Sequence, residues 1–169
     1  MNKTLHQRFR PAALLALLLA LLLCSLGPAA PAGAQLITDL DDQGVPLVRS
    51  LESLRDLDYQ AWQLVAFREG PPGGALRLRV VGYPGKVRLN HPTALTVASG
   101  QRRWQLEDVT LANPKLAGDA REAAAEFNLE PLLSDLTKDR PLRLQLPGVF
   151  TELPVPPFVV KEWRELPSS

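Results

Sequence analysis

The sequence predicts a mostly β protein: an antiparallel sandwich or partly open barrel with one or two short helices. Two apolar segments rich in aromatic and branched residues, 58–67 and 75–89, stand on either side of a segment of prolines and glycines, 70–74. This arrangement is the usual signal for consecutive antiparallel strands. Over residues 76–80, leucine and valine alternate with arginine, which is typical of a sheet with one buried face and one face in water.

The segment before this alternating strand has apolar side chains on both of its faces, over residues 61–67. Such a pattern suits a strand in the middle of a sandwich or barrel. The residues that precede it, 45–57, fit two structures. Val48 and Leu51 have helical spacing, but Pro46 and the short length fit a strand that leads into a turn equally well.

Turn chemistry predicts the boundaries of the next strands. Tyr83-Pro84-Gly85-Lys86 predicts a type II turn, because proline presets φ at the first central position and glycine accepts a positive φ at the second. One strand should therefore end near Gly82 and the next should follow Lys86. Residues 94–98 and 103–109 are expected to form another pair of strands.

The last third of the chain mixes predicted helices and strands. Asp119 and Glu122 fit a capping box, which predicts a short helix over residues 120–127. A proline near the first helical position predicts one helical turn within 130–136. Leucines that alternate with polar residues predict a strand over 142–146.

Two closing segments are expected to be extended. The prolines of residues 153–157 exclude a central position in a sheet, because proline cannot donate to the hydrogen-bond ladder. Residues 158–163 predict a final strand with Val159 and Trp163 on a shared face.

We expect one apolar core, built from the inward positions of these elements. Burying each leucine or valine contributes ~1.5–3 kcal/mol to folding. The core candidates are Trp62, Leu64, Leu78, Val80, Leu95, Val97, Trp104, Leu106, Leu144, Val159 and Trp163.

Residues 1–34 are predicted to be a Sec-type secretory signal peptide. The start is basic, residues 12–23 are an unbroken apolar run, and Ala32-Gly33-Ala34 places small residues where a signal peptidase cleaves. Two alternatives are an uncleaved anchor helix and lipid attachment at Cys24. The apolar run is shorter than the ~20 residues that a membrane span needs, and Leu23 stands where lipid attachment requires a small residue.

After the signal peptide, residues 35–49 are expected to be a loose leader and residues 50–166 a single β-rich domain. The chain has 19 Lys and Arg and 18 Asp and Glu. Three of the basic residues and none of the acidic ones precede residue 35, so 16 remain against 18, a net charge of −2. A near-neutral domain lacks the electrostatic footprint for nucleic acid and the polybasic cluster for anionic lipid. No transmembrane span is expected after cleavage.

Few residue types suited to catalysis follow residue 34. The only cysteine precedes it, and His91 is the only histidine after it. A Ser-His-Asp site would have to use His91, which no Gly-x-Ser-x-Gly elbow accompanies. One histidine without cysteine cannot make a zinc site of several His or Cys ligands. We therefore predict no catalytic, cofactor-binding or metal-binding residues, no cofactor and no enzymatic activity.

Five short motifs occur in order along the chain after the signal peptide: Ser53-Leu54-Arg55-Asp56, Ala61-Trp62-Gln63, Leu78-Arg79-Val80-Val81-Gly82-Tyr83-Pro84-Gly85, His91-Pro92 and Pro156-Pro157-Phe158-Val159-Val160-Lys161-Glu162-Trp163. Together they resemble a cyanobacterial family known as a domain of unknown function, DUF3122. The resemblance covers about residues 50–163 and implies a small exported protein of oxygenic phototrophs, in the periplasm or the thylakoid lumen. The family carries no established activity, so no functional residue is transferred.

These observations lead us to expect a non-catalytic accessory or protein-binding domain. It would act through a sheet face or edge on an unidentified protein partner, such as a membrane complex. Arg77, Arg79 and Arg88 form the candidate contact for an acidic partner. The alternatives are a carrier of a small apolar ligand, which an unfilled interior would favour, and a hydrolase that uses His91.

Overall fold

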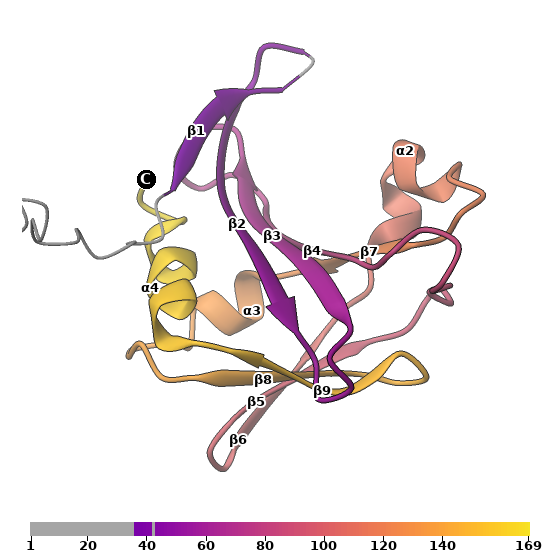
Figure 1. Ribbon diagram of the computed structural model, residues 1–169. Coiled ribbons are helices and arrows are strands. Elements are labelled where there is room, and N and C mark those ends of the chain that lie inside the picture. Colours follow the sequence, from indigo (N-terminus) through magenta and orange to yellow (C-terminus); the bar gives the residue numbers. More distant parts are fainter. Residues whose placement is uncertain (1–35, 42) are drawn as a thin grey trace, which may run out of the picture. The chain divides into compact units, whose positions relative to one another are not determined.

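The computed structural model describes residues 36–41 and 43–169, which belong to the compact unit Ala34–Ser169. The predicted signal peptide, residues 1–34, lies outside the described residues. Two antiparallel sheets pack around a shared apolar core (Figure 1). The predicted fold class is confirmed: the domain is mostly β, with two sheets that do not close into a barrel and a few short helices.

The first sheet has five strands in the order β1-β2-β3-β4-β7. Its register places Ala66 between Ser50 on one neighbouring strand and Leu78 on the other. Alternate residues of each strand therefore point into the core. The strands are β1 (Ile37–Leu40), β2 (Pro46–Arg55), β3 (Ala61–Glu69), β4 (Leu76–Val81) and β7 (Ala124–Asn128).

The second sheet has four strands in the order β6-β5-β8-β9. Asp108, just after β6, forms a bridge to Phe127 of the first sheet. On the other side, Leu57 N donates to Glu152 O at 3.2 Å, so the sheets are linked at both sides. The remaining elements are β5 (Leu95–Ser99), β6 (Arg102–Leu106), β8 (Leu142–Leu146), β9 (Phe150–Val155), η1 (Thr110–Ala112), α2 (Pro114–Ala117), α3 (Glu130–Leu133) and α4 (Pro157–Glu165).

The predicted core is largely confirmed. All of the predicted core residues are buried except Trp104, which is half-buried on the edge strand β6. The ring of Trp62 meets the ring of Phe150 edge-on, with centroids 5.0 Å apart. A Cβ atom at Gly82 would lie 2.8 Å from the Trp62 ring, which explains why a glycine follows β4 beside this tryptophan.

The predicted turn at Tyr83–Lys86 is found, and so is the extended course of residues 153–156, although Pro157, also expected to be extended, begins α4. Lys86 N donates to Tyr83 O at 3.1 Å, and Gly85 has a φ of 82°, as a type II turn requires. The ambiguous segment 45–57 forms the strand β2, and the helical turn predicted within 130–136 is α3. Pro154 lies on β9 at the edge of its sheet, where its missing N–H costs no ladder hydrogen bond.

The predicted helix over residues 120–127 is wrong. Asp119 holds a turn instead of a helix start: Arg121 N donates to its Oδ1 at 3.0 Å, and Glu122 has a φ of 48°. The chain then forms β7, in which Ala125 and Phe127 face the core. Pairing with the open side of β4 outweighs the helix propensity of the alanines.

The predicted final strand over residues 158–163 is also wrong, because these residues lie in the helix α4. Pro157 occupies the first turn, where proline is pre-organised for a helix. Val159 and Trp163 do share a buried face, since residues four apart lie on one side of a helix as well as of a strand. Leu166, just beyond the helix, extends the same apolar packing.

The leader predicted to be loose, residues 35–49, is ordered where the structure describes it. Ile37 pairs with Arg49 and Thr38 with Val48, so β1 and the start of β2 form a hairpin. In the connection, the Asp41 carboxylate accepts hydrogen bonds from Gln43 N and Val45 N at 2.8 Å. Backbone pairing orders this segment despite its polar side chains, which is why composition alone did not reveal it.

Candidate functional site

Arg77 and Arg79 lie on the face of β4 that points away from the core. Arg79 Nε and Nη2 donate to Glu126 Oε2 at 3.1 and 2.8 Å, and Arg77 Nε lies 4.0 Å from Glu126 Oε1. The register explains this pairing, since Arg79 and Glu126 are opposite each other on β4 and β7. The Glu126 side chain is 7% exposed and those of Arg77 and Arg79 are 27% and 33% exposed.

Further contacts fix the orientation of this arginine pair. The Arg79 guanidinium lies over the Phe67 ring, 5.3 Å from its centroid, which is a cation–π geometry. Asn113 Nδ2 donates to Glu126 Oε2 at 3.2 Å. Two guanidinium groups therefore share one buried carboxylate, and the cluster of Arg77, Arg79 and Glu126 carries one unbalanced positive charge.

Aliphatic side chains continue the same outer face towards β1. The register places Leu51 opposite Val65, which lies opposite Arg79. Leu51 and Ile37 are 42% and 41% exposed. We call the outer face formed by Ile37, Leu51, Val65, Arg77 and Arg79 the arginine face.

Arg88 does not belong to the arginine face. It lies in the segment between β4 and β5 and pairs with a different carboxylate, Glu122, with Arg88 Nη2 and Glu122 Oε2 2.7 Å apart. Both side chains are exposed. The structure thus brings together two of the three predicted contact residues and gives the third its own ion pair.

His91 forms an ion-pair geometry with Asp108, the connection that a catalytic dyad would have. His91 Nδ1 lies 2.8 Å from Asp108 Oδ2. Asp108 also accepts hydrogen bonds from Thr93 N and Thr110 N, both at 2.9 Å. Among the described residues, His91 is hydrogen-bonded to no hydroxyl group. This geometry indicates a structural role, in which the Asp108 carboxylate joins the loop after β4 to the start of η1.

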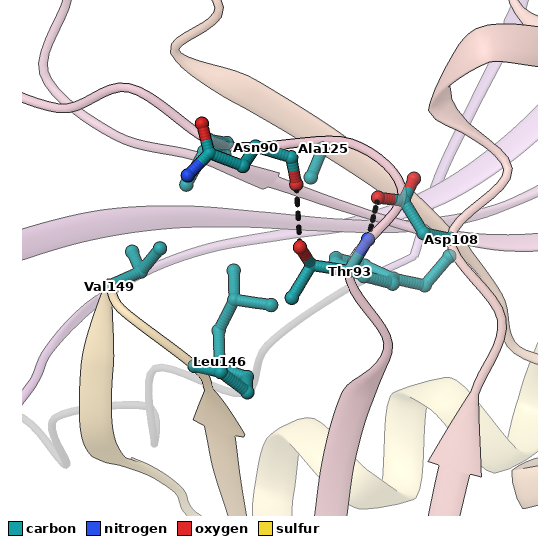
Figure 2. A pocket seen from close by; sticks show the side chains of 9 residues that line it. Asn90, Thr93, Asp108, Ala125, Leu146 and Val149 are labelled. Atoms are coloured by element: carbon teal, nitrogen blue, oxygen red, sulfur yellow. Dashed lines mark hydrogen bonds between the residues drawn. The ribbon is translucent and has the colours of Figure 1, made fainter.

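Burial of Asp108 is offset by these hydrogen bonds. Burial raises its pKa, but the hydrogen bonds from Thr110, His91 and the Thr93 backbone together lower it by more. The pKa of Asp108 therefore lies below its ordinary value. Figure 2 shows Thr93 between the carbonyl of Asn90 and the carboxylate of Asp108. The small cavity beside them has a volume of about 10 Å³, enough for a single water molecule.

A more open groove lies at the other side of the hairpin between β8 and β9. Its volume is about 430 Å³, and Asp58 from the turn between β2 and β3 forms one wall. Sequence reasoning missed this groove because its walls come from segments far apart in the chain. The one local signal is Asp56, whose position between two strands is typical of an Asx turn.

Glu126 was also missed, although a local signal exists for it. It is the one charged residue within the strand β7, and a carboxylate at such a position needs a partner on the neighbouring strand. Among the described residues, no group of three or more His, Cys, Asp or Glu could hold a metal ion. Over the same residues, no helix has the length and apolar character to cross a membrane.

Comparison with known proteins identifies the family. No curated protein and no solved structure was found to match the chain. A family model described as a protein of unknown function, DUF3122, matches residues 34–166. The match spans both sheets and α4, including the arginine face and the groove. The chain therefore belongs to the DUF3122 family.

Proposed function

We propose that this chain is an exported, non-catalytic protein-binding domain that holds an acidic partner against its arginine face. The observation that carries the proposal is the sharing of one buried carboxylate by Arg77 and Arg79. The unbalanced positive charge that results stands next to exposed aliphatic side chains. Arginine beside apolar surface is the composition that protein interfaces favour.

Pre-organisation adds to this argument. Free arginine side chains lose rotamer entropy when they bind a partner, which reduces affinity. Glu126 and Phe67 already hold Arg79 in one orientation, so less entropy remains to be lost. The planar guanidinium can still offer its other donors to a carboxylate of the partner.

The proposed location rests on the sequence. A basic start, an apolar run and the Ala32-Gly33-Ala34 motif support export. The cyanobacterial family that the chain resembles supports the periplasm or the thylakoid lumen, and a membrane complex is the kind of partner we expect there. A hydrolase that uses His91 has less support, because the described residues offer no hydroxyl group hydrogen-bonded to that side chain.

An affinity capture tests this function. The tagged chain, incubated with solubilised cyanobacterial membranes and lumen, should retain one partner complex that mass spectrometry identifies. Arg77→Glu should weaken capture of that complex about tenfold, since a like charge then faces the acidic partner. We choose Arg77 because its 4.0 Å contact with Glu126 contributes less to the fold than the hydrogen bonds of Arg79.

Arg88→Glu provides the matched control. It makes the same charge change at an exposed arginine that lies outside the arginine face, and it should leave the retained complex unchanged. Equal capture by the Arg77→Glu variant and the unmodified chain would exclude the arginine face as the contact. A bait that retains no protein but carries a small molecule would instead support the carrier.

A further inference from the structure

The open groove is built from both sheets of the domain. Thr96 and Gln145 form its floor; they are opposite each other on β5 and β8 and point outward, because their neighbours Val97 and Leu144 are buried. The hairpin between β8 and β9, residues 146–151, forms one wall. Asp58 closes the other side. With a volume of about 430 Å³, the groove has the size of a small-ligand or peptide side-chain site.

The turn that carries Asp58 is held firmly in place. The Asp56 carboxylate accepts hydrogen bonds from Asp58 N and Gln60 N, both at 2.9 Å, and from Trp62 Nε1 at 2.8 Å. Leu57 N donates to a carbonyl of β9 at 3.2 Å. The turn is thus fixed to the core and to the second sheet, and Asp58 has a defined position beside the groove.

This turn holds large apolar side chains out in solvent. Tyr59 is 80% exposed and Leu57 is 58% exposed. Tyr59 has a φ of 61°, a left-handed conformation that costs a residue other than glycine about 1–3 kcal/mol. Strain of this kind persists only where surrounding contacts impose it, and it concentrates at binding sites. An exposed aromatic ring on such a turn is available for a partner.

The charge of the groove favours a cation. Asp58 is the only charged residue in its lining, and its carboxylate has no ion-pair or hydrogen-bond partner among the described residues. Neither Arg143 nor Arg55 pairs with Asp58: Arg143 pairs with Glu152 at 3.5 Å, and Arg55 donates to Tyr59 O at 2.8 Å. A carboxylate without a partner attracts lysine or arginine, and the same turn carries the exposed ring of Tyr59, the next residue in the chain.

We propose that this groove binds a lysine or arginine side chain on an extended segment of a partner protein. The cation pairs with Asp58, while Thr96, Gln145 and Thr151 offer hydrogen bonds to the peptide backbone. The segment crosses the groove and does not add to β9 as a further strand. Pro154 lacks an N–H there, and Glu152 O is already occupied by Leu57 N.

The inference goes beyond the proposed function, because the groove lies over the second sheet and attracts a cation. The arginine face lies on the first sheet and attracts an anionic partner. Failure of one leaves the other standing. If both hold, the domain joins an acidic partner on one sheet to a basic segment on the other.

Two-dimensional amide NMR of the purified, isotope-labelled chain tests the proposal. The probes are a short capped peptide with one central lysine and the same peptide with norleucine, which keeps the aliphatic stem and removes the charge. The lysine peptide should shift the amide signals of Asp58, Gly148 and Thr151 in a saturable way, and the norleucine peptide should not. Asp58→Asn should weaken the binding of the lysine peptide about fivefold, the loss expected for one exposed ion pair.

Asp39→Asn is the control, because it removes an exposed carboxylate from β1, on the first sheet. It should leave the affinity for the lysine peptide unchanged. The Asp58 side chain makes no hydrogen bond among the described residues, so its replacement should also leave the other amide signals in place. Equal shifts with both peptides, no shift with either, or unchanged affinity in Asp58→Asn would each overturn the proposal. So would saturable shifts of the same signals by a neutral disaccharide in place of the lysine peptide.

Discussion

At the scale of single residues, the Asp56 side chain joins a surface turn to the core through three hydrogen bonds. Its carboxylate is buried and accepts from two backbone amides of the turn and from the indole of Trp62. Removing it would leave that buried indole N–H without an acceptor. An unsatisfied buried donor costs about 1–3 kcal/mol, in addition to the turn hydrogen bonds that are lost.

We therefore predict that Asp56→Ala lowers the free energy of unfolding by about 3 kcal/mol. Urea denaturation followed by tryptophan fluorescence measures this loss. Asp58→Ala, two residues along the same turn, should stay within ~0.5 kcal/mol of the unmodified chain, because its side chain is exposed. A similar loss in both variants would show that the turn backbone, and not the Asp56 carboxylate, holds the structure.

At the scale of elements, α4 is attached to the first sheet by polar contacts at two points. Ser50 Oγ on β2 donates to Glu162 Oε2 on the helix, and Arg68 Nη1 on β3 donates to Leu166 O at 2.6 Å. Glu162 is 4% exposed, and its Oε1 has no hydrogen-bond partner among the described residues. A buried carboxyl group with one open oxygen favours the protonated form.

The surroundings of Glu162 raise its pKa above the ordinary value. Burial is the main cause; the hydrogen bond from Ser50 lowers the pKa, and the nearby carboxylates of Glu52 and Glu165 raise it again. Since the folded chain then holds this proton more tightly than the unfolded chain, folding is favoured at low pH. The contribution is complete below the unfolded pKa of 4.5 and is lost as the pH rises through the folded pKa.

We predict that the pH-dependent contribution of Glu162 to the free energy of unfolding is absent in Glu162→Gln, which resembles the protonated side chain. Above pH 4.5, the free energy of unfolding should fall more steeply for the unmodified chain than for the variant. Urea denaturation at a series of pH values measures both slopes. Glu130→Gln, at an exposed position of α3, should keep the unmodified slope. Identical slopes in all three proteins would refute a raised pKa for Glu162.

Asp108 has the opposite effect on the pH dependence of the free energy of unfolding, and it acts in a different pH range. Its pKa is below the ordinary value of 3.8, so its contribution is present above that pH and is lost only in stronger acid. The two groups can therefore be separated in one titration.

At the scale of the whole molecule, the interior between the sheets is filled by side chains. Leucine, valine and tryptophan side chains from both sheets and α4 form one core cluster. The small cavity beside Asp108 measures about 10 Å³, whereas small-molecule sites occupy about 300–1,000 Å³. A packed sandwich of this kind gives no support to a carrier that encloses an apolar ligand.

We predict that the folded chain does not enclose a small apolar ligand. Titration with an environment-sensitive apolar dye should give no saturable increase in fluorescence, and native mass spectrometry should show the mass of the chain alone. The same dye should bind after partial unfolding in acid, which controls for its response. Stoichiometric binding to the folded chain would contradict the packed interior.

The sequence by itself determined the fold class, most of the core and several turns. These features follow from local rules: alternation with a period of two marks a half-buried strand, and Pro84-Gly85 specifies its turn through allowed φ values. Leu78 and Val97 could be assigned to the core because their own strands show that alternation. The arginines of β4 were assigned to the outer face by the same rule.

The tertiary structure alone decided the features that depend on partners distant in the chain. The alanines of β7 became a strand because β4 offered an open side, and the segment after Pro156 became a helix because it packs on β2. Glu126 pairs with Arg79, and Asp58 and Gln145 line one groove, only once the strands are assembled. Period-two and turn rules describe one segment at a time, whereas ion pairs and grooves depend on which segments the shared core brings together.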